Sequence, residues 1–391
     1  MRHFFASILL FSLAACDSWV QDVPHPAGVL SDDALANEAL IPAQVAALHN
    51  TFAASFGALS LWSDLLSDAV ASDPETAKGF QDILEIDGRA MSPANVHTSE
   101  TLEKVYQLRY LADALRQRVE GMQTFKDLAL RNRALYYAHL YKGISRYFLA
   151  AYYGMKETGD GAPIESGVWM PTATLFAEAL QSFDAAQSYI ATPVDSRLLH
   201  TLRARVYLLT DEPLKALMAA QNGLKPGDAP LRVLFSEQAP NPWFTYRNSV
   251  MLPMRLAGIV KLIPAEAVRI PVEEVNTLGK MVFRISKYTN RTTPMVFASW
   301  QENELILAEL EWSQNPQSAR SRVNSVRSVY DLPPLTQLTA QEVLDERDRT
   351  LFGVGQRLLD QRRNNLWPST SGNWQYLPIS AAERLRNPNL N

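Results

Sequence analysis

Helical spacing of apolar residues over most of the chain constrains its fold more than any other feature. In the range 134–153, apolar residues recur every three or four positions, which is the spacing of one face of an α-helix. These residues are Tyr137, Tyr141, Ile144, Phe148 and Ala151. The ranges 102–120 and 198–209 show the same period. We therefore expect an all-α or α-rich domain of paired helices.

Strand-like alternation is scarce by contrast. The best local candidate is the short run 281–285, Met-Val-Phe-Arg-Ile. Most of the 23 Pro and 17 Gly residues then mark loops between helices. One such boundary follows the helix at 198–209, where Asp211 is expected as the N-cap of the next helix and Pro213 in its first turn.

Small residues in the middle of the chain favour close contact between helices. Ala204, Ala216 and the pair 219–220 lie where the two helices of a tetratricopeptide-like unit approach each other. The repeat is degenerate, because one unit does not align with the next at a fixed period. On periodicity alone, a tetratricopeptide-like arrangement and a general helical bundle both remain open.

The N-terminal residues have the features of an exported lipoprotein. A basic start at residues 1–3 precedes an apolar run at 4–13, which is too short to span a bilayer as a helix. The Leu-Ala-Ala-Cys sequence at 13–16 is similar to a bacterial lipobox. We therefore expect a signal peptide at 1–15 and lipid attachment at Cys16, the alternative being an ordinary leader that contains a buried Cys.

The remaining chain is expected to form one tethered domain. Residues 16–40 contain Pro24, Pro26 and Gly28 and are predicted to be a flexible spacer, and residues 41–391 a single domain. Without Arg2, 36 basic residues stand against 41 acidic ones, a net charge of −5 that argues against a nucleic-acid surface. Because Cys16 is the only Cys, no disulfide forms within one chain.

Four sequence blocks in the range of about 297–391 resemble the SusD/RagB family. They are the helix Trp300–Leu310, the helix Ala319–Arg327, a charged signature with Glu346, Arg347, Gly355, Arg357, Asp360 and Arg362, and the ending Tyr376–Leu390. The ranges 133–164 and 202–222 are similar to helices of the same family. The chain departs from the family pattern at Thr350, Val354 and Leu358, and it is shorter than most members. Paired charges of the signature can join the last helices to their neighbours.

The resemblance implies a SusD-like fold, in which tetratricopeptide-like helix pairs support an irregular, loop-rich side that faces the ligand. It also implies a lipid-anchored outer-membrane protein, exposed at the cell surface. Such a protein binds an oligosaccharide or peptide and passes it to a SusC-type TonB-dependent transporter. The alternative is a tetratricopeptide-type scaffold lipoprotein that serves envelope assembly and has no small ligand.

A glycan site needs exposed aromatic platforms flanked by polar side chains, because sugar rings have apolar faces and hydroxyl rims. The densest such cluster outside a convincing helix is Trp243, Phe244, Tyr246, Arg247 and Asn248. Trp169 is a second candidate, whereas Trp300, Trp312 and the tyrosines of 136–153 are assigned to the core, and Trp367 and Trp374 to structural positions. Replacement of Trp243 or Tyr246 by Ala is expected to weaken binding with little effect on stability. The alternative is that Trp243, Phe244 or Trp169 packs against the scaffold.

Motifs for catalysis or metal binding are absent from the sequence. The six His residues are scattered, without a His-Glu-x-x-His pattern, and no Gly-x-Ser-x-Gly elbow occurs. Glu302, Glu304 and Glu309 lie on one predicted helix and do not by themselves face each other across a cleft, as a glycosidase requires. We therefore expect no enzyme activity, no metal and no cofactor.

Overall fold

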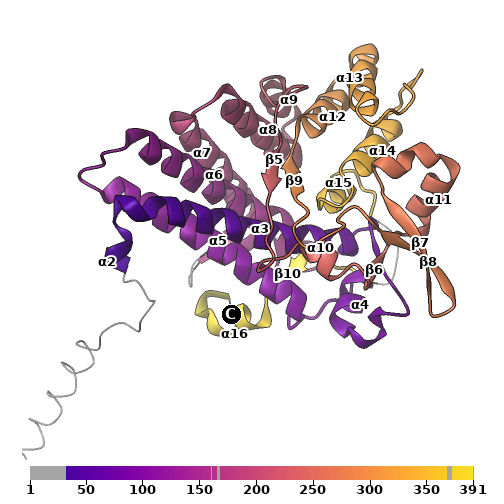
Figure 1. The fold of residues 1–391 in the computed structure, drawn as a ribbon, viewed down its shortest axis with the longest axis horizontal. Helices are drawn as coiled ribbons and strands as arrows, with labels where there is room; N and C mark the ends of the chain where they lie inside the picture. The colour runs from indigo at the N-terminus through magenta and orange to yellow at the C-terminus, as the bar shows by residue number, and fades with distance from the viewer. Residues whose placement is uncertain (1–31, 160, 165–167, 368–371, 391) are drawn as a thin grey trace, which may run out of the picture.

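Helices that pack side by side in chain order form one side of the molecule (Figure 1). The computed structural model describes residues 32–159, 161–164, 168–367 and 372–390. The packed pairs are α3 (Ile41–Leu66) with α5 (Val96–Gly121), α6 (Leu128–Tyr152) with α7 (Thr172–Ala186), α8 (Pro193–Leu209) with α9 (Pro213–Gln221), and α12 (Trp300–Glu311) with α13 (Pro316–Ser328). Successive pairs contact each other, α5 on α6, α7 on α8 and α9 on α12. The prediction of tetratricopeptide-like helix pairs is confirmed.

The helix boundaries follow from local capping. The helix predicted at 134–153 begins earlier, at Leu128, because Asp127 accepts a hydrogen bond from the backbone N–H of Leu130 at 2.9 Å. A capping box between the N-cap Thr192 and Asp195 in the first turn stabilises the start of helix α8. The prediction for Asp211 is wrong. Its φ is +55°, in the left-handed region, and Glu212 occupies the N-cap of α9 instead.

Short two-stranded ladders join the loops, and the strand candidate at 281–285 is confirmed. It lies in β8 (Lys280–Ile285), which pairs antiparallel with β7 (Val272–Thr277). The other antiparallel pairs are β1 (Ala71–Ser72) with β6 (Val250–Met251), β3 (Gly161–Ile164) with β4 (Val168–Pro171), and β5 (Leu231–Val233) with β9 (Met295–Ala298). The one parallel pair among the described residues is β2 (Tyr153–Gly154) with β10 (Leu377–Pro378).

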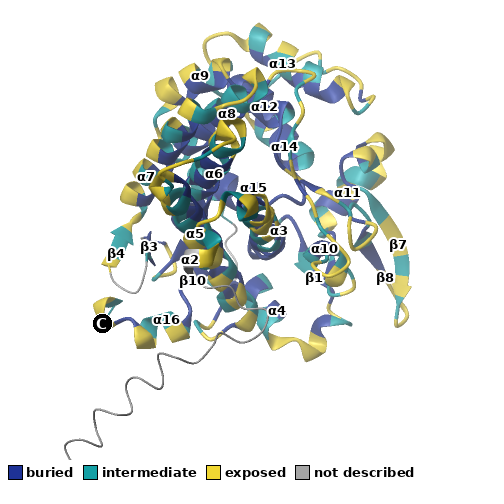
Figure 2. Cartoon of the chain, turned by 60° about the vertical axis from the view of Figure 1, so that its left-hand side comes forward, coloured by how far each residue is buried: buried dark blue, intermediate teal, exposed yellow. Residues whose placement is uncertain are grey.

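Irregular segments from two parts of the chain gather on the other side of the molecule. The first segment holds β1, η2 (Ala77–Gly79) and α4 (Gln81–Asp87); the second holds α10 (Pro242–Thr245), β6, α11 (Met254–Leu262), η4 (Pro264–Val268), β7 and β8. The β1–β6 ladder joins the two segments. Figures 1 and 2 show both segments beside the C-terminal end of α3. We call this the loop-rich side.

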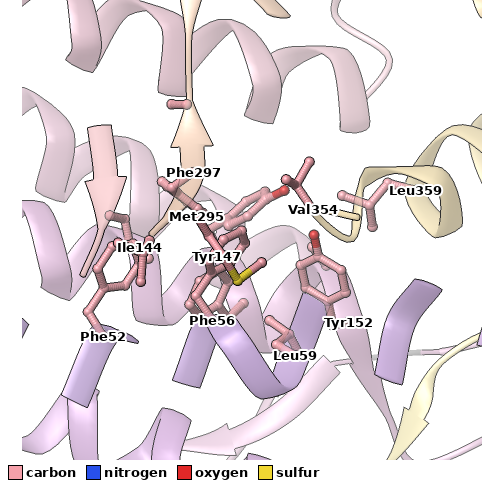
Figure 3. Close-up of a cluster of buried hydrophobic side chains, with 14 of the residues drawn as sticks. Phe52, Phe56, Leu59, Ile144, Tyr147, Tyr152, Met295, Phe297, Val354 and Leu359 are labelled. Carbon is pink, nitrogen blue, oxygen red and sulfur yellow. The ribbon is translucent and has the colours of Figure 1, made fainter. Parts of the chain in front are cut away.

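Aromatic stacking fills the core between α3, α6 and β9 (Figure 3). The rings of Phe52 and Phe56 on α3 are both stacked near Phe148 on α6, with centroids 6.3 Å away. Phe297 on β9 meets both α3 rings edge-on, at 5.2 and 5.0 Å. Such offset and edge-to-face pairs are the preferred arrangements of aromatic side chains. The core therefore links the first helix pair to the strand that precedes α12.

The C-terminal helices close the fold through ion pairs. These helices are α14 (Ala340–Thr350), α15 (Gln356–Arg363) and α16 (Ala381–Arg386), followed by η5 (Pro388–Leu390). Arg347 Nε lies 3.0 Å from Asp360 Oδ2, and Arg357 Nε lies 2.6 Å from Asp68 Oδ1, just after α3. The predicted role of the paired charges, to join the last helices to their neighbours, is confirmed.

Part of the predicted spacer takes helical form. Cys16 and the expected signal peptide lie outside the described residues. Within the expected spacer 16–40, the structure places α2 at Asp32–Leu35 and η1 at Glu38–Leu40. The carboxylate of Glu38 accepts hydrogen bonds from the backbone N–H groups of Lys126 and Asp127, both at 2.9 Å. Residues 38–40 are thus fixed to the domain. Across the described ranges, no helix has both the length and the apolar character needed to cross a bilayer.

Candidate functional site

The predicted aromatic cluster lies on the loop-rich side, on and after the short helix α10. Asn241 fixes the start of this helix through two hydrogen bonds of its side chain. The side-chain oxygen accepts a hydrogen bond from the backbone N–H of Trp243 at 2.9 Å, and the side-chain amide donates one to the backbone carbonyl of Thr293 at 2.8 Å. Pro242 occupies the first turn, where its missing N–H costs nothing. The backbone then continues into β6, so the residues after α10 face the segment that follows β1.

Trp243 differs from the expectation of an exposed platform. Only 3% of the residue is exposed. Its indole N–H donates to Ser60 Oγ at 2.9 Å, and its ring lies 5.6 Å from that of Tyr288. The alternative of packing against the scaffold therefore describes Trp243 in this structure, because α10 packs on α3 and the indole reaches Ser60 of that helix. Both faces of the ring are unavailable to a ligand in this conformation.

The other four residues of the cluster remain at the surface. The Arg247 guanidinium lies over the ring of Phe244, 3.9 Å from its centroid, and both residues are partly exposed. Tyr246 is partly exposed and meets the imidazole of His97 edge-on at 5.2 Å. Asn248 is exposed, and its backbone carbonyl accepts from the hydroxyl of Thr76. We call Phe244, Tyr246, Arg247, Asn248 and His97 the α10 cluster.

The α10 cluster combines aromatic and hydrogen-bonding side chains with one positively charged group. Burial lowers the pKa of His97, which stacks on Trp62 with ring centroids 4.3 Å apart, so the imidazole is uncharged at neutral pH. Burial raises the pKa of Tyr246, so its hydroxyl stays protonated. Arg247 is then the one ionised side chain among the five. Two aromatic rings, an amide and a guanidinium supply the apolar and hydrogen-bonding contacts that a sugar ring requires. His97 was missed by sequence reasoning, because only the fold brings α5 beside α10.

Trp169 does not join the α10 cluster. It lies in β4 opposite Pro163 and packs partly against the core. Figure 2 shows the β3–β4 hairpin on the side of the C-terminal helix α16, well away from α10 and β1. Trp300 is buried, as assigned, whereas Trp312, Trp367 and Trp374 are partly buried and pack against the core.

A second feature, which sequence reasoning missed, is a cavity of about 380 Å³ between the helix pairs and the loop-rich side. It is lined by residues of β5, β9 and the first turn of α12, by residues at the end of η4 and after β8, and by Tyr330 and residues in the range 350–354. Lys287, Tyr288 and Glu302 are among its lining residues. The lining residues come from several segments between positions 230 and 354, so no local motif could indicate the cavity. Tyr288 also contacts Trp243, so the buried indole lies between the α10 cluster and the cavity wall.

Within the described residues, no three His, Cys, Asp or Glu side chains come together as metal ligands. Glu304 and Glu309 are engaged in ion pairs, with Arg322 at 2.9 Å and with Arg363, and Glu302 is paired with Arg205 at 2.6 Å. These three carboxylates have structural partners rather than a shared cleft.

Neither a protein-family model nor a curated protein matches the sequence. Solved structures do match. A SusD superfamily protein from Bacteroides vulgatus has 17% identity, covers 91% of this chain and 98% of its own, and has a TM-score of 0.75. A laminarin-binding SusD-like protein has 15% identity, coverage of 90% and 99%, and a TM-score of 0.69. B. fragilis NanU has 12% identity, coverage of 94% and 99%, and a TM-score of 0.70. The chain therefore has the SusD-like fold over about nine-tenths of its length.

Proposed function

We propose that this protein is a lipid-anchored nutrient-binding protein of the outer membrane, and that it binds an oligosaccharide through the α10 cluster. The observation that carries the proposal is the position of this cluster. On a SusD-like scaffold, partly exposed Phe244 and Tyr246 lie beside Arg247 and Asn248 on the loop-rich side. One structural neighbour is named for binding laminarin, a glycan, which favours an oligosaccharide over a peptide.

The tether and the transporter complete the proposal. Lipid attachment at Cys16 would hold the domain at the membrane, where a high effective concentration lets moderate affinity suffice. The bound oligosaccharide would then pass to a SusC-type TonB-dependent barrel. The protein would carry no cofactor and perform no chemistry on the ligand, a role that agrees with the carboxylates of α12 being engaged in ion pairs.

The test is extraction of the native lipidated protein in mild detergent, followed by identification of the proteins that copurify with it. A stoichiometric TonB-dependent barrel is the expected result. Recovery of envelope-assembly proteins without a barrel would favour the scaffold alternative. A variant with Cys16→Ala should leave the membrane fraction, and continued membrane association would contradict the lipid anchor.

A further inference from the structure

The cavity between the helix pairs and the loop-rich side opens beside the β5–β9 ladder. Arg232 of β5 and Val296 of β9 are partners in this ladder, and both line the cavity. Two lining residues are well exposed, Val296 at 37% and Val268, at the end of η4, at 59%. Arg232 is exposed as well. The cavity is therefore open to solvent at this edge, with a cationic side chain at its mouth.

The anionic group of the cavity wall is already neutralised. Glu302 forms two hydrogen bonds with Arg205, at 2.7 and 2.6 Å. Arg269, a cation of the wall, is likewise held by Glu266 and Glu346, each at 2.6 Å. These pairs bring no free carboxylate to the cavity.

Two cations of the wall are left without such partners. In the part of the chain that the structure describes, neither Lys287 nor Arg232 forms an ion pair with a carboxylate. Lys287 Nζ donates to the backbone carbonyl of Phe352, which leaves its positive charge uncompensated at that contact. Burial lowers the pKa of Lys287, the buried carboxyl of Asp64 is the acidic group that acts to raise it, and Asp64 does not line the cavity. The lining of the cavity thus has an excess of positive charge, carried by Lys287 and Arg232.

The size and remaining lining of the cavity suit a small organic ligand. Its volume of about 380 Å³ lies within the range of small-molecule sites, which begins at roughly 300 Å³. Tyr288, Tyr330 and Trp300 give the wall aromatic surface, and Gln301 adds an amide. The first turn of α12 also faces the cavity, and its positive end adds to the field of the two cations.

We propose that this cavity binds an acidic sugar unit, with its carboxylate held by Lys287 and Arg232 and its ring within the aromatic lining. The site is distinct from the α10 cluster, because none of the residues of that cluster lines the cavity. The inference rests on the proposed glycan-binding function and names the class of saccharide that the protein takes, one that contains uronic-acid units.

The test is a ligand-observed NMR titration of the full chain in mild detergent with sodium glucuronate, glucose and inorganic phosphate. This method detects the weak binding expected of single sugar units. Arg232→Gln removes an exposed cation and is expected to fold normally, and Lys287→Met removes the second cation. Lys225→Gln is the matched control, because Lys225 is exposed near the start of β5 but does not line the cavity.

Glucuronate is expected to bind, and glucose, which lacks the carboxylate and loses both charged contacts, to bind at least about tenfold more weakly, a difference of about 1.4 kcal/mol or more. Each cavity variant should weaken glucuronate about tenfold or more, and Lys225→Gln should not. Equal binding of glucose and glucuronate would overturn the proposal. Phosphate binding as tight as glucuronate binding would show a general anion site and would also overturn the acidic-sugar assignment.

The same titration repeated with neutral oligosaccharides, on wild type and Tyr246→Ala, separates this inference from the proposed function. If neutral oligosaccharides bind and depend on Tyr246 while glucuronate does not bind, only the inference about the cavity fails. If no saccharide of either kind binds, the proposed glycan-binding function fails with it.

Discussion

The guanidinium of Arg205 on α8 and the carboxylate of Glu302 on α12 form a bidentate pair at 2.7 and 2.6 Å, and both side chains are almost fully buried. Arg205 also donates to the carbonyl of Phe297 at 2.7 Å and lies over its ring. The pair joins two helices that are far apart in sequence and fixes the first turn of α12 against β9. It therefore supports the wall of the cavity.

We expect Glu302→Gln to destabilise the protein by about 3–5 kcal/mol, because removing one partner leaves a buried cation uncompensated. Urea denaturation followed by circular dichroism measures this loss. Glu237→Gln is the control, since Glu237 pairs with Arg291 at the surface, where such pairs contribute about 0–1 kcal/mol. Equal stability of the two variants would contradict a structural role for the Arg205–Glu302 pair.

Trp243→Ala is now expected to lower stability, in contrast to the prediction from sequence. Truncating a buried aromatic side chain costs about 3–5 kcal/mol, and this indole packs against Tyr288 and Phe352. Trp243→Phe keeps the ring volume in part and loses the hydrogen bond to Ser60, so a smaller loss is expected. Thermal melts of the two variants test this order. A Trp243→Ala protein as stable as wild type would mean that the indole is not buried in solution.

Gly143→Ala should destabilise the contact between α6 and α7. A Cβ atom at this position would lie 2.5 Å from Cε1 of Phe183, closer than any ordinary contact. Overpacking of this kind costs about 1–3 kcal/mol. Gly258→Ala on α11 is the matched control, because no atom lies within 4 Å of its added Cβ. There the substitution should stabilise the helix by about 0.5–1 kcal/mol. Loss of stability in both variants would contradict the packing argument.

The buried carboxyl of Asp64 is expected to make the free energy of unfolding depend on pH. The residue is 1% exposed, and burial raises the pKa of its carboxyl from 3.8 to about 8. The folded state therefore holds the proton more tightly than the unfolded state. The stability that this proton confers is fully present below about pH 4 and is lost as the pH rises toward 8.

Asp64→Asn removes this titration, so its stability relative to wild type should increase between pH 4 and 7.5. Burial lowers the pKa of the neighbouring Lys287 to about 8, so this amine stays charged over most of that window. Arg255 and Asp348 also face Asp64 and are unchanged in the variant. Urea denaturation of both proteins at several pH values measures the difference. Parallel stability curves would show that Asp64 titrates normally.

Much of the scaffold could be predicted because the formation and pairing of helices depend on the local spacing of apolar residues in the sequence. The period at 134–153 and the alternation at 281–285 both correspond to elements of the structure. The N-cap of α9 was misplaced because Asp211 has a left-handed backbone, which composition does not reveal. Trp243 was misjudged because its burial depends on the packing of α10 against α3, which the local sequence does not show.

The functional surfaces were harder to predict, because they are assembled from distant segments. Tyr246 meets His97 only through the packing of α10 on α3 and α5. The cavity that contains Lys287 and Arg232 requires the β5–β9 pairing and the turn after β8. The density of aromatic residues in the sequence indicated every residue of the α10 cluster except His97. No comparable signal marked the cavity.

The most direct test of glycan binding by the α10 cluster is a glycan-array measurement on the full chain, with wild type, Tyr246→Ala and Tyr110→Ala compared at matched thermal stability. Tyr110 is 57% exposed on α5, thirteen residues from His97 or roughly 20 Å along the helix. We expect wild type and Tyr110→Ala to bind the same oligosaccharides, and Tyr246→Ala to lose about tenfold or more in affinity. Unchanged binding by Tyr246→Ala, or no binding by any of the three, would contradict the account.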